Sequence, residues 1–81
     1  MEMAELVEMI QDRQGKTSIE SYANQIGIRG ATLYRYYNKQ RDMSLEVIRK
    51  LIQFYRQQGD TEMVDALKEF AVGDGDSSPP Q

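Results

Sequence analysis

"TSIESYANQIGIRGATLYRYYN", residues 17–38, carries an apolar stripe at helical spacing on each side of Gly27. The first stripe consists of Ile19, Tyr22, Ala23 and Ile26, and the second of Leu33, Tyr36 and Tyr37. Thr17 followed three residues later by Glu20 is a capping-box pattern, which predicts the start of a helix. Gly27 is suited to the left-handed conformation that ends a helix, and Asn38 can take the same conformation at the end of the next one. The stretch therefore predicts two short helices joined by a tight turn.

Three apolar stripes outside this stretch predict three more helices. They are Met3, Leu6, Val7 and Ile10; Leu45, Ile48, Leu51, Ile52 and Tyr55; and Met63, Val64, Leu67, Phe70 and Ala71. Ser44 is a good N-cap for the second of these helices, which should end at Gly59. Asp60 or Thr61 can cap the last one. Since no strand pattern stands out, the expected fold class is all-α, a compact bundle of five short helices around one core.

The length of the chain predicts a single domain, because 81 residues are too few for two. The helical apolar pattern continues to about residue 72, so we expect the domain to span residues 1–72. The remaining residues, 73–81, read GDGDSSPPQ, with no apolar side chain to bury and two consecutive prolines. This composition is typical of a disordered tail.

The composition excludes several kinds of site. The chain has no Cys and no His, which removes disulfides, zinc–thiolate sites, thiol nucleophiles and the usual neutral-pH general base. Nothing in the sequence combines a nucleophile, a base and an electrostatic stabiliser, so we expect neither an enzyme nor a metal or cofactor site. The opening residues, MEMAELVEMI, lack the basic start and unbroken apolar run of a signal peptide. We therefore expect a cytoplasmic protein with no membrane or small-molecule partner.

The charges are distributed unevenly, although the net charge is only −3. Residues 13–56 contain nine Lys or Arg against three acidic residues, a balance of +6. The two ends together contain one Lys against ten acidic residues, a balance of −9. This asymmetry predicts a basic face in the middle of the chain, a common sign of a polyanionic partner.

Two short helices joined by a tight glycine-containing turn form a helix-turn-helix. The chain resembles one family with this motif, the phage-repressor and Cro type, also called XRE or lambda-repressor-like. The residues that carry the resemblance are Tyr22-Ala23, Ile26-Gly27-Ile28, Leu33, Tyr36, Asn38, Ser44-Leu45 and Leu51. The resemblance covers about residues 3–71. It implies an all-helical DNA-binding domain, usually a dimer on a pseudo-palindromic operator, whose third helix (about 29–38) enters the major groove.

The resemblance also implies which residues touch DNA. It places the base readers at Gly30, Ala31 and Arg35, and Arg29 and Thr32 flank them on the face that the apolar stripe turns outward. Arg35 has a chemical reason to matter, since a guanidinium fits guanine O6 and N7 in a bidentate pair. The residues expected to hold the DNA backbone are Thr17, Ser18, Tyr34, Asn38, Lys39 and Arg41.

We therefore interpret the chain as a sequence-specific double-stranded DNA-binding protein. It would be a transcriptional regulator of phage or bacterial type, a homodimeric repressor that acts by occupying its operator. A different class of function stays open: a helical adaptor or antitoxin-like module that uses the same fold to bind protein. The acidic ends and the net negative charge favour this alternative, whereas the basic middle favours DNA.

Overall fold

The computed structural model describes residues 2–38 and 43–76 of the 81-residue chain. The helices in this part are α1 (Met3–Gln14), α2 (Ile19–Ile26), α3 (Gly30–Tyr37), α4 (Leu45–Gln57) and α5 (Thr61–Asp76). No β-strand occurs in the described ranges. The prediction of an all-α bundle of five helices is thus confirmed for them.

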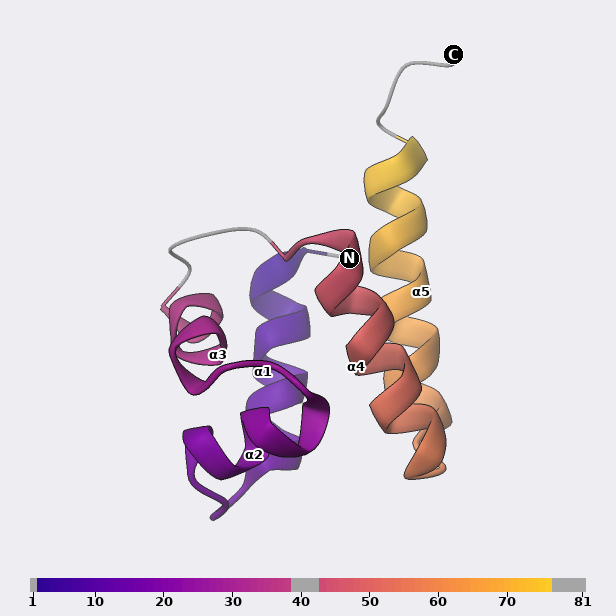
Figure 1. Ribbon diagram of the computed structural model, residues 1–81. Helices are drawn as coiled ribbons and strands as arrows, with labels where there is room; N and C mark the ends of the chain where they lie inside the picture. Colours follow the sequence, from indigo (N-terminus) through magenta and orange to yellow (C-terminus); the bar gives the residue numbers. More distant parts are fainter. Residues whose placement is uncertain (1, 39–42, 77–81) are drawn as a thin grey trace.

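The helices form two pairs that α1 joins (Figure 1). In one pair α4 and α5 run antiparallel along each other, and in the other α2 packs against α3. Helix α1 contacts α5 on one side and α3 on the other, while α2 also touches α4. This arrangement places α3 and α5 at opposite sides of the molecule.

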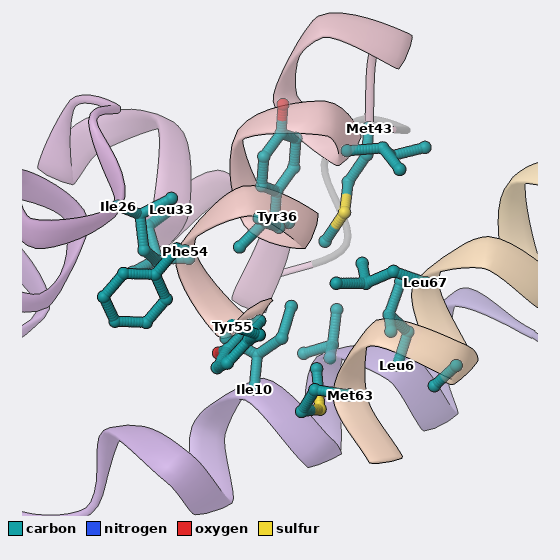
Figure 2. Packing of buried hydrophobic residues seen from close by; sticks show 14 of the residues in the cluster. Leu6, Ile10, Ile26, Leu33, Tyr36, Met43, Phe54, Tyr55, Met63 and Leu67 are labelled. Atoms are coloured by element: carbon teal, nitrogen blue, oxygen red, sulfur yellow. The ribbon is translucent and has the colours of Figure 1, made fainter. Parts of the chain in front are cut away.

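The core lies where the apolar stripes of all five helices meet (Figure 2). The largest side chains that are completely or almost completely buried are Leu6, Ile10, Leu33, Leu51, Tyr55, Met63 and Leu67. Burying one such side chain contributes about 1.5–3 kcal/mol to the free energy of unfolding. The predicted stripes supply most of this core, and three further residues belong to it that the stripes omit: Met43, Phe54 and Ala66.

Leu45 is the predicted stripe residue that is exposed, whereas the others are buried or half-buried. It is 57% exposed, on the outer side of the first turn of α4. Met43 is buried at this end of the core instead. Met43 precedes the N-cap and Ile48 is the fourth residue of the helix, so the two occupy the positions of a hydrophobic staple.

The structure corrects two of the predicted helix ends and confirms three others, which are Ser44, Asp60 and Gly27. The N-cap of α2 is Ser18, whose Oγ accepts the Ser21 N–H at 3.1 Å, so the predicted capping box at Thr17 is wrong. Asn38 is not left-handed (φ −93°), because its side-chain amide instead donates to the Tyr34 carbonyl at 2.9 Å. Ser44 caps α4 by accepting the Val47 N–H at 3.2 Å, and Asp60 caps α5 by accepting the Met63 N–H at 3.2 Å.

Helix α5 continues to Asp76, past the domain boundary that the sequence predicts at residue 72. The backbone is therefore helical in the first four residues of the stretch predicted as a tail. The rest of that stretch, 77–81, lies outside the described residues. None of the helices in the described ranges combines the length and the apolarity needed to cross a bilayer.

Candidate nucleic-acid interface

The turn between α2 and α3 fixes the direction of α3. Gly27 has φ +100°, the left-handed conformation that the sequence predicts for it. The N–H groups of Gly27 and Ile28 both donate to the Ala23 carbonyl at 2.9 Å. On the outer side, Lys50 Nζ donates to the Gly27 carbonyl at 3.2 Å. Backbone bonds and a side chain of α4 thus hold the three residues that connect the helices.

Helix α3 approaches α2 closely where it begins, at Gly30. A Cβ atom on Gly30 would lie 3.2 Å from the Cα atom of Glu20, which is tighter than ordinary van der Waals contact. Gly30 is half-buried, so it lies against α2 rather than on the outer face of α3. Its small size therefore serves the contact between the two helices.

The outer face of α3 is the side opposite its buried residues, Leu33 and Tyr36. Arg29, Ala31, Tyr34 and Arg35 are exposed, and Thr32 is half-buried. Within the described part of the chain, neither Arg29 nor Arg35 has an acidic partner. Both guanidinium groups are therefore available to an external ligand. Of the five predicted base readers, Ala31 and Arg35 lie four residues apart on this exposed face, Arg29 is exposed at the N-cap of α3, and Thr32 is half-buried.

The residues predicted to hold the DNA backbone are more scattered. Tyr34, which is 55% exposed, and Asn38 lie together at the end of α3. Ser18 is exposed at the start of α2, where its hydroxyl is used as the cap. Thr17 lines a cleft of about 590 Å³ whose other walls come from α1, α2, α4 and the start of α5, with none from α3. Lys39 and Arg41 lie outside the described residues.

A shallow groove of about 510 Å³ adjoins the outer face of α3. Its walls are Asn24, Gly27, Ile28, Arg29, Thr32, Glu46, Val47 and Lys50. The groove thus lies between the α2–α3 turn and the first half of α4. Lys50 contributes a cation to it, although Glu46 Oε2 lies 3.8 Å from Lys50 Nζ and partly balances that charge.

One cation of the basic segment, residues 13–56, forms ion pairs between α1 and α5 instead of lying on the outer face of α3. Arg13, at the end of α1, donates from Nε to Asp60 Oδ2 at 2.9 Å and from Nη2 to Glu62 Oε1 at 2.8 Å. The hydrogen bond to Asp60 raises the pKa of Arg13 and, in return, lowers the pKa of Asp60. Arg13 therefore joins α1 to α5 and does not add to a DNA-binding face. Sequence spacing could not reveal this pair, because its members are 47 positions apart.

Most of the tyrosines have a structural role. The hydroxyl groups of Tyr22 and Tyr55 form a buried hydrogen bond of 2.8 Å, and Tyr37 donates to Gln14 Oε1 at 2.7 Å. Burial raises the pKa of all three. Tyr36 is buried as well. Tyr34 alone among the five tyrosines is exposed, so it is the aromatic ring that a ligand of α3 could touch.

No family model, curated protein or solved structure matches this chain. The functional hypothesis therefore depends on the outer face of α3 and on its surroundings. Among the described residues, His, Cys, Asp and Glu form no group of three or more that could hold a metal ion.

Proposed function

We propose that this chain binds double-stranded DNA in a sequence-specific way and regulates transcription, with α3 in the major groove. The observation that carries the proposal is the outer face of α3. Arg35 and the small residue Ala31 are exposed on it four residues apart, Arg29 is exposed at the N-cap, and neither arginine has an acidic partner in the described part of the chain. A helix with this face combines cations for phosphates or guanines with a small side chain that permits close approach.

The dimensions of the two partners support this geometry. The major groove is about 12 Å wide, and an α-helix with its side chains is about 10–12 Å across. A guanidinium in the groove can donate two hydrogen bonds to the O6 and N7 atoms of one guanine. Arg35 is the candidate for this contact, while Thr32 can donate to a base or pack its methyl group on thymine. Arg29, at the N-cap of α3, is the candidate for a neighbouring base or phosphate.

The packing that fixes α3 in place also supports a role in recognising DNA bases. Leu33 and Tyr36 anchor its inner side in the core, with exposed fractions of 0% and 3%. Gly27 and Lys50 fix the turn before it. Side chains on a helix anchored in this way need little reordering on binding, and such preorganisation favours sequence discrimination.

We further propose that two copies act together on an operator. Two α3 helices related by a two-fold axis would reach successive major grooves about 34 Å apart on one side of the duplex. A dimer bound there would repress by occupancy, because it blocks polymerase. The half-sites would then be inverted copies of each other.

A protein-binding module is the second candidate, and two exposed apolar side chains favour it. Tyr34 and Leu45 are 55% and 57% exposed, and they are the large apolar residues that the described surface exposes most. The side chain of Glu20 also lies beside the start of α3. A carboxylate in that position would repel phosphate.

Selection from random duplex DNA at moderate salt tests the proposal. We expect recovery of a two-fold-symmetric consensus with half-sites about one helical turn apart. The logarithm of the binding constant should fall with the logarithm of salt concentration, with a slope of about −0.9 for each phosphate neutralised. Absence of any enriched sequence, together with affinity that does not respond to salt, would contradict DNA binding and favour the protein-binding module.

A further inference from the structure

The outer side of α4 carries a row of exposed residues that the proposed DNA contact does not use. Arg49, Ile52 and Arg56 follow one another at spacings of three and four residues, which keeps them on one side of the helix. We call these three residues the basic row. Both arginines are exposed and Ile52 is half-buried, and the three line a shallow groove of about 490 Å³ with Gln53 and Gln57.

The arginines of the basic row are not paired with acidic side chains in the part of the chain that the structure describes. Neither Arg49 nor Arg56 forms an ion pair with any residue in the described ranges. The inner side of α4 packs in the core through Ile48, Leu51 and Tyr55. Two unpaired cations on either side of an apolar residue form a surface that suits an acidic amphipathic helix.

Helix α1 presents such a surface on its own outer side. Glu5, Met9 and Asp12 follow one another at spacings of four and three residues, and we call them the acidic row. Glu5 and Asp12 are exposed and Met9 is half-buried, and with Glu8 they line a groove of about 460 Å³. Their ties within the chain are weak: Glu5 Oε1 accepts the Glu2 N–H at 3.2 Å, and Asp12 Oδ2 lies 3.9 Å from Arg13 Nη1.

The charges and spacings of the two rows are complementary when the two helices run antiparallel. In both rows the charged ends are seven residues apart, about 10.5 Å along a helix, and the apolar residue is about 4.5 Å from one end. In an antiparallel pair, Arg49 therefore lies opposite Asp12 and Arg56 opposite Glu5. Ile52 then meets Met9, and both can be buried between the ion pairs.

We propose that the basic row of one copy of this protein docks on the acidic row of another copy. The rows do not pair within one chain, because neither Arg49 nor Arg56 forms an ion pair with a described residue, and Met9 and Ile52 each pack against the chain's own core. If both rows of a chain meet the same neighbour, the contact closes a two-fold dimer. If they meet different neighbours, copies add in a line. The contact is small, so we expect association at about 10 µM to 1 mM protein.

Sedimentation velocity of the full chain without DNA tests this contact independently of the proposed function. We expect the mean mass to rise with protein concentration and the association to weaken with salt. The basic-row variant, Arg49→Glu with Arg56→Glu, should raise the concentration at the association midpoint by more than about tenfold, because it places carboxylates opposite the carboxylates of the acidic row. The acidic-row variant, Glu5→Lys with Asp12→Lys, should do the same; it also removes the hydrogen bond from the Glu2 N–H to Glu5, so its helical circular dichroism is compared with that of the native chain.

An equimolar mixture of the two variants is the decisive measurement, because each reversed row then faces an opposite charge. We expect the mixture to associate although neither variant does so alone. The matched control is Arg29→Glu with Arg35→Glu, which changes the net charge equally and should leave the midpoint unchanged. If a reversed variant loses helical circular dichroism, Arg49→Gln with Arg56→Gln removes the charges without reversing them.

Three results would overturn the proposal. The first is a chain that stays monomeric up to about 1 mM, since even small interfaces form at that concentration. The second is an association midpoint that does not respond to either reversed row. The third is a mixture of the two variants that does not associate. A loss of DNA affinity in the basic-row variant, with its mass profile unchanged, would assign Arg49 and Arg56 to phosphate contacts instead.

Discussion

Arg13 Nε and Asp60 Oδ2 lie 2.9 Å apart and join the end of α1 to the start of α5. Each side chain is 23% exposed, so the pair is largely shielded from water. Asp60 has a second role, because its Oδ1 accepts the Met63 N–H and caps α5. One carboxylate thus holds together two helices that are far apart in the sequence. The two roles can be separated by substitution.

Asp60→Asn should lose the ion pair but keep the cap, because asparagine is also a good N-cap. We expect a loss of about 1 kcal/mol in the free energy of unfolding at pH 7. Asp60→Ala should lose about 2 kcal/mol, since the cap is removed as well. Urea unfolding measures both values. Asp12→Asn is the matched control and should change little, because Asp12 is 84% exposed and 3.9 Å from Arg13.

The difference in the free energy of unfolding between the native chain and Asp60→Asn should depend on pH. The hydrogen bond from Arg13 lowers the pKa of Asp60 in the folded state below the ordinary value of 3.8. A carboxylate with a lowered pKa stabilises the fold above its unfolded-state pKa, and this contribution is lost as the pH falls through the folded-state value. We therefore expect a constant difference at neutral pH that shrinks below about pH 4. A difference that persists in acid would mean that the ion pair is not its source.

The hydroxyl pair of Tyr22 and Tyr55 gives a further prediction. Tyr55→Phe leaves the Tyr22 hydroxyl without its partner, and Tyr22→Phe does the same to Tyr55. Each change should cost about 1 kcal/mol in the free energy of unfolding. The double variant should cost less than the sum, because no hydroxyl is then left unpaired. Urea unfolding of the four proteins gives the coupling, and strict additivity would show that the two hydroxyls act independently.

Alkaline pH should unfold the protein through its buried tyrosines. Burial raises the folded-state pKa of Tyr22, Tyr37 and Tyr55 above the ordinary value of 10.0. The stability that this shift represents is fully present below pH 10 and is lost as the pH rises from there toward the folded-state values. We expect the absorbance of these three phenolates to appear together with the loss of helical circular dichroism. Ionisation of all the tyrosines with the helices intact would contradict their burial.

The sequence predicted the parts of the fold that depend on local chemistry. Gly27, Ser44 and Asp60 end or begin helices as expected, because caps are recognised within a few residues. Thr17 and Ser18 are chemically almost equivalent as caps, so local pattern could not choose between them. Leu45 fits the helical spacing of α4, but whether a first-turn residue is covered depends on what packs there, and Met43 is buried at that end.

Long-range features of the candidate site could not be predicted. The ion pair of Arg13 with Asp60 depends on how α1 meets α5, which the residues near Arg13 do not encode. The charge count of the basic middle therefore included a cation that faces α5. The resemblance implied that Gly30 is a base reader, whereas the structure places it against Glu20. The exposure of Arg29, Ala31, Tyr34 and Arg35 was predictable, since it follows from the apolar stripe on the other side of α3.

Gly30→Ala tests the close contact between α2 and α3. The added methyl group would lie 3.2 Å from the Cα atom of Glu20, and the short turn leaves the helices little freedom to separate. We expect a net loss of about 1 kcal/mol in the free energy of unfolding, because the strain outweighs the better helix propensity of alanine. A gain in stability would show that the helices can move apart.

Gly27 provides the comparison, since a Cβ atom there would meet nothing within 4 Å. Any loss of stability on substituting Gly27 would therefore come from its φ of +100° alone. Asparagine tolerates that backbone conformation better than alanine does. We therefore expect Gly27→Asn to be more stable than Gly27→Ala. At Gly30 the order should reverse, because the larger side chain has less room. Thermal unfolding of the four variants distinguishes backbone strain from overpacking.

Arg35→Ala tests the proposed reading of DNA by α3. Arg35 is exposed and has no acidic partner in the described part of the chain, so the substitution should leave the stability of the fold almost unchanged. If its guanidinium reads a guanine, the variant should lose about 1–3 kcal/mol of discrimination at one base pair in each half-site. Arg35→Lys should recover little of this, because an ammonium group cannot form the bidentate pair.

The matched control is Lys68→Ala, which removes one positive charge from α5, on the opposite side of the molecule from α3. It should keep the preference for every base pair. Binding of selected and singly substituted operators at fixed salt separates the two possible roles of Arg35. A phosphate contact would weaken all sequences alike and reduce the salt slope by about one unit, whereas a base contact changes the preference at one position. Equal affinity of Arg35→Ala and the native chain for every operator would remove Arg35 from the interface.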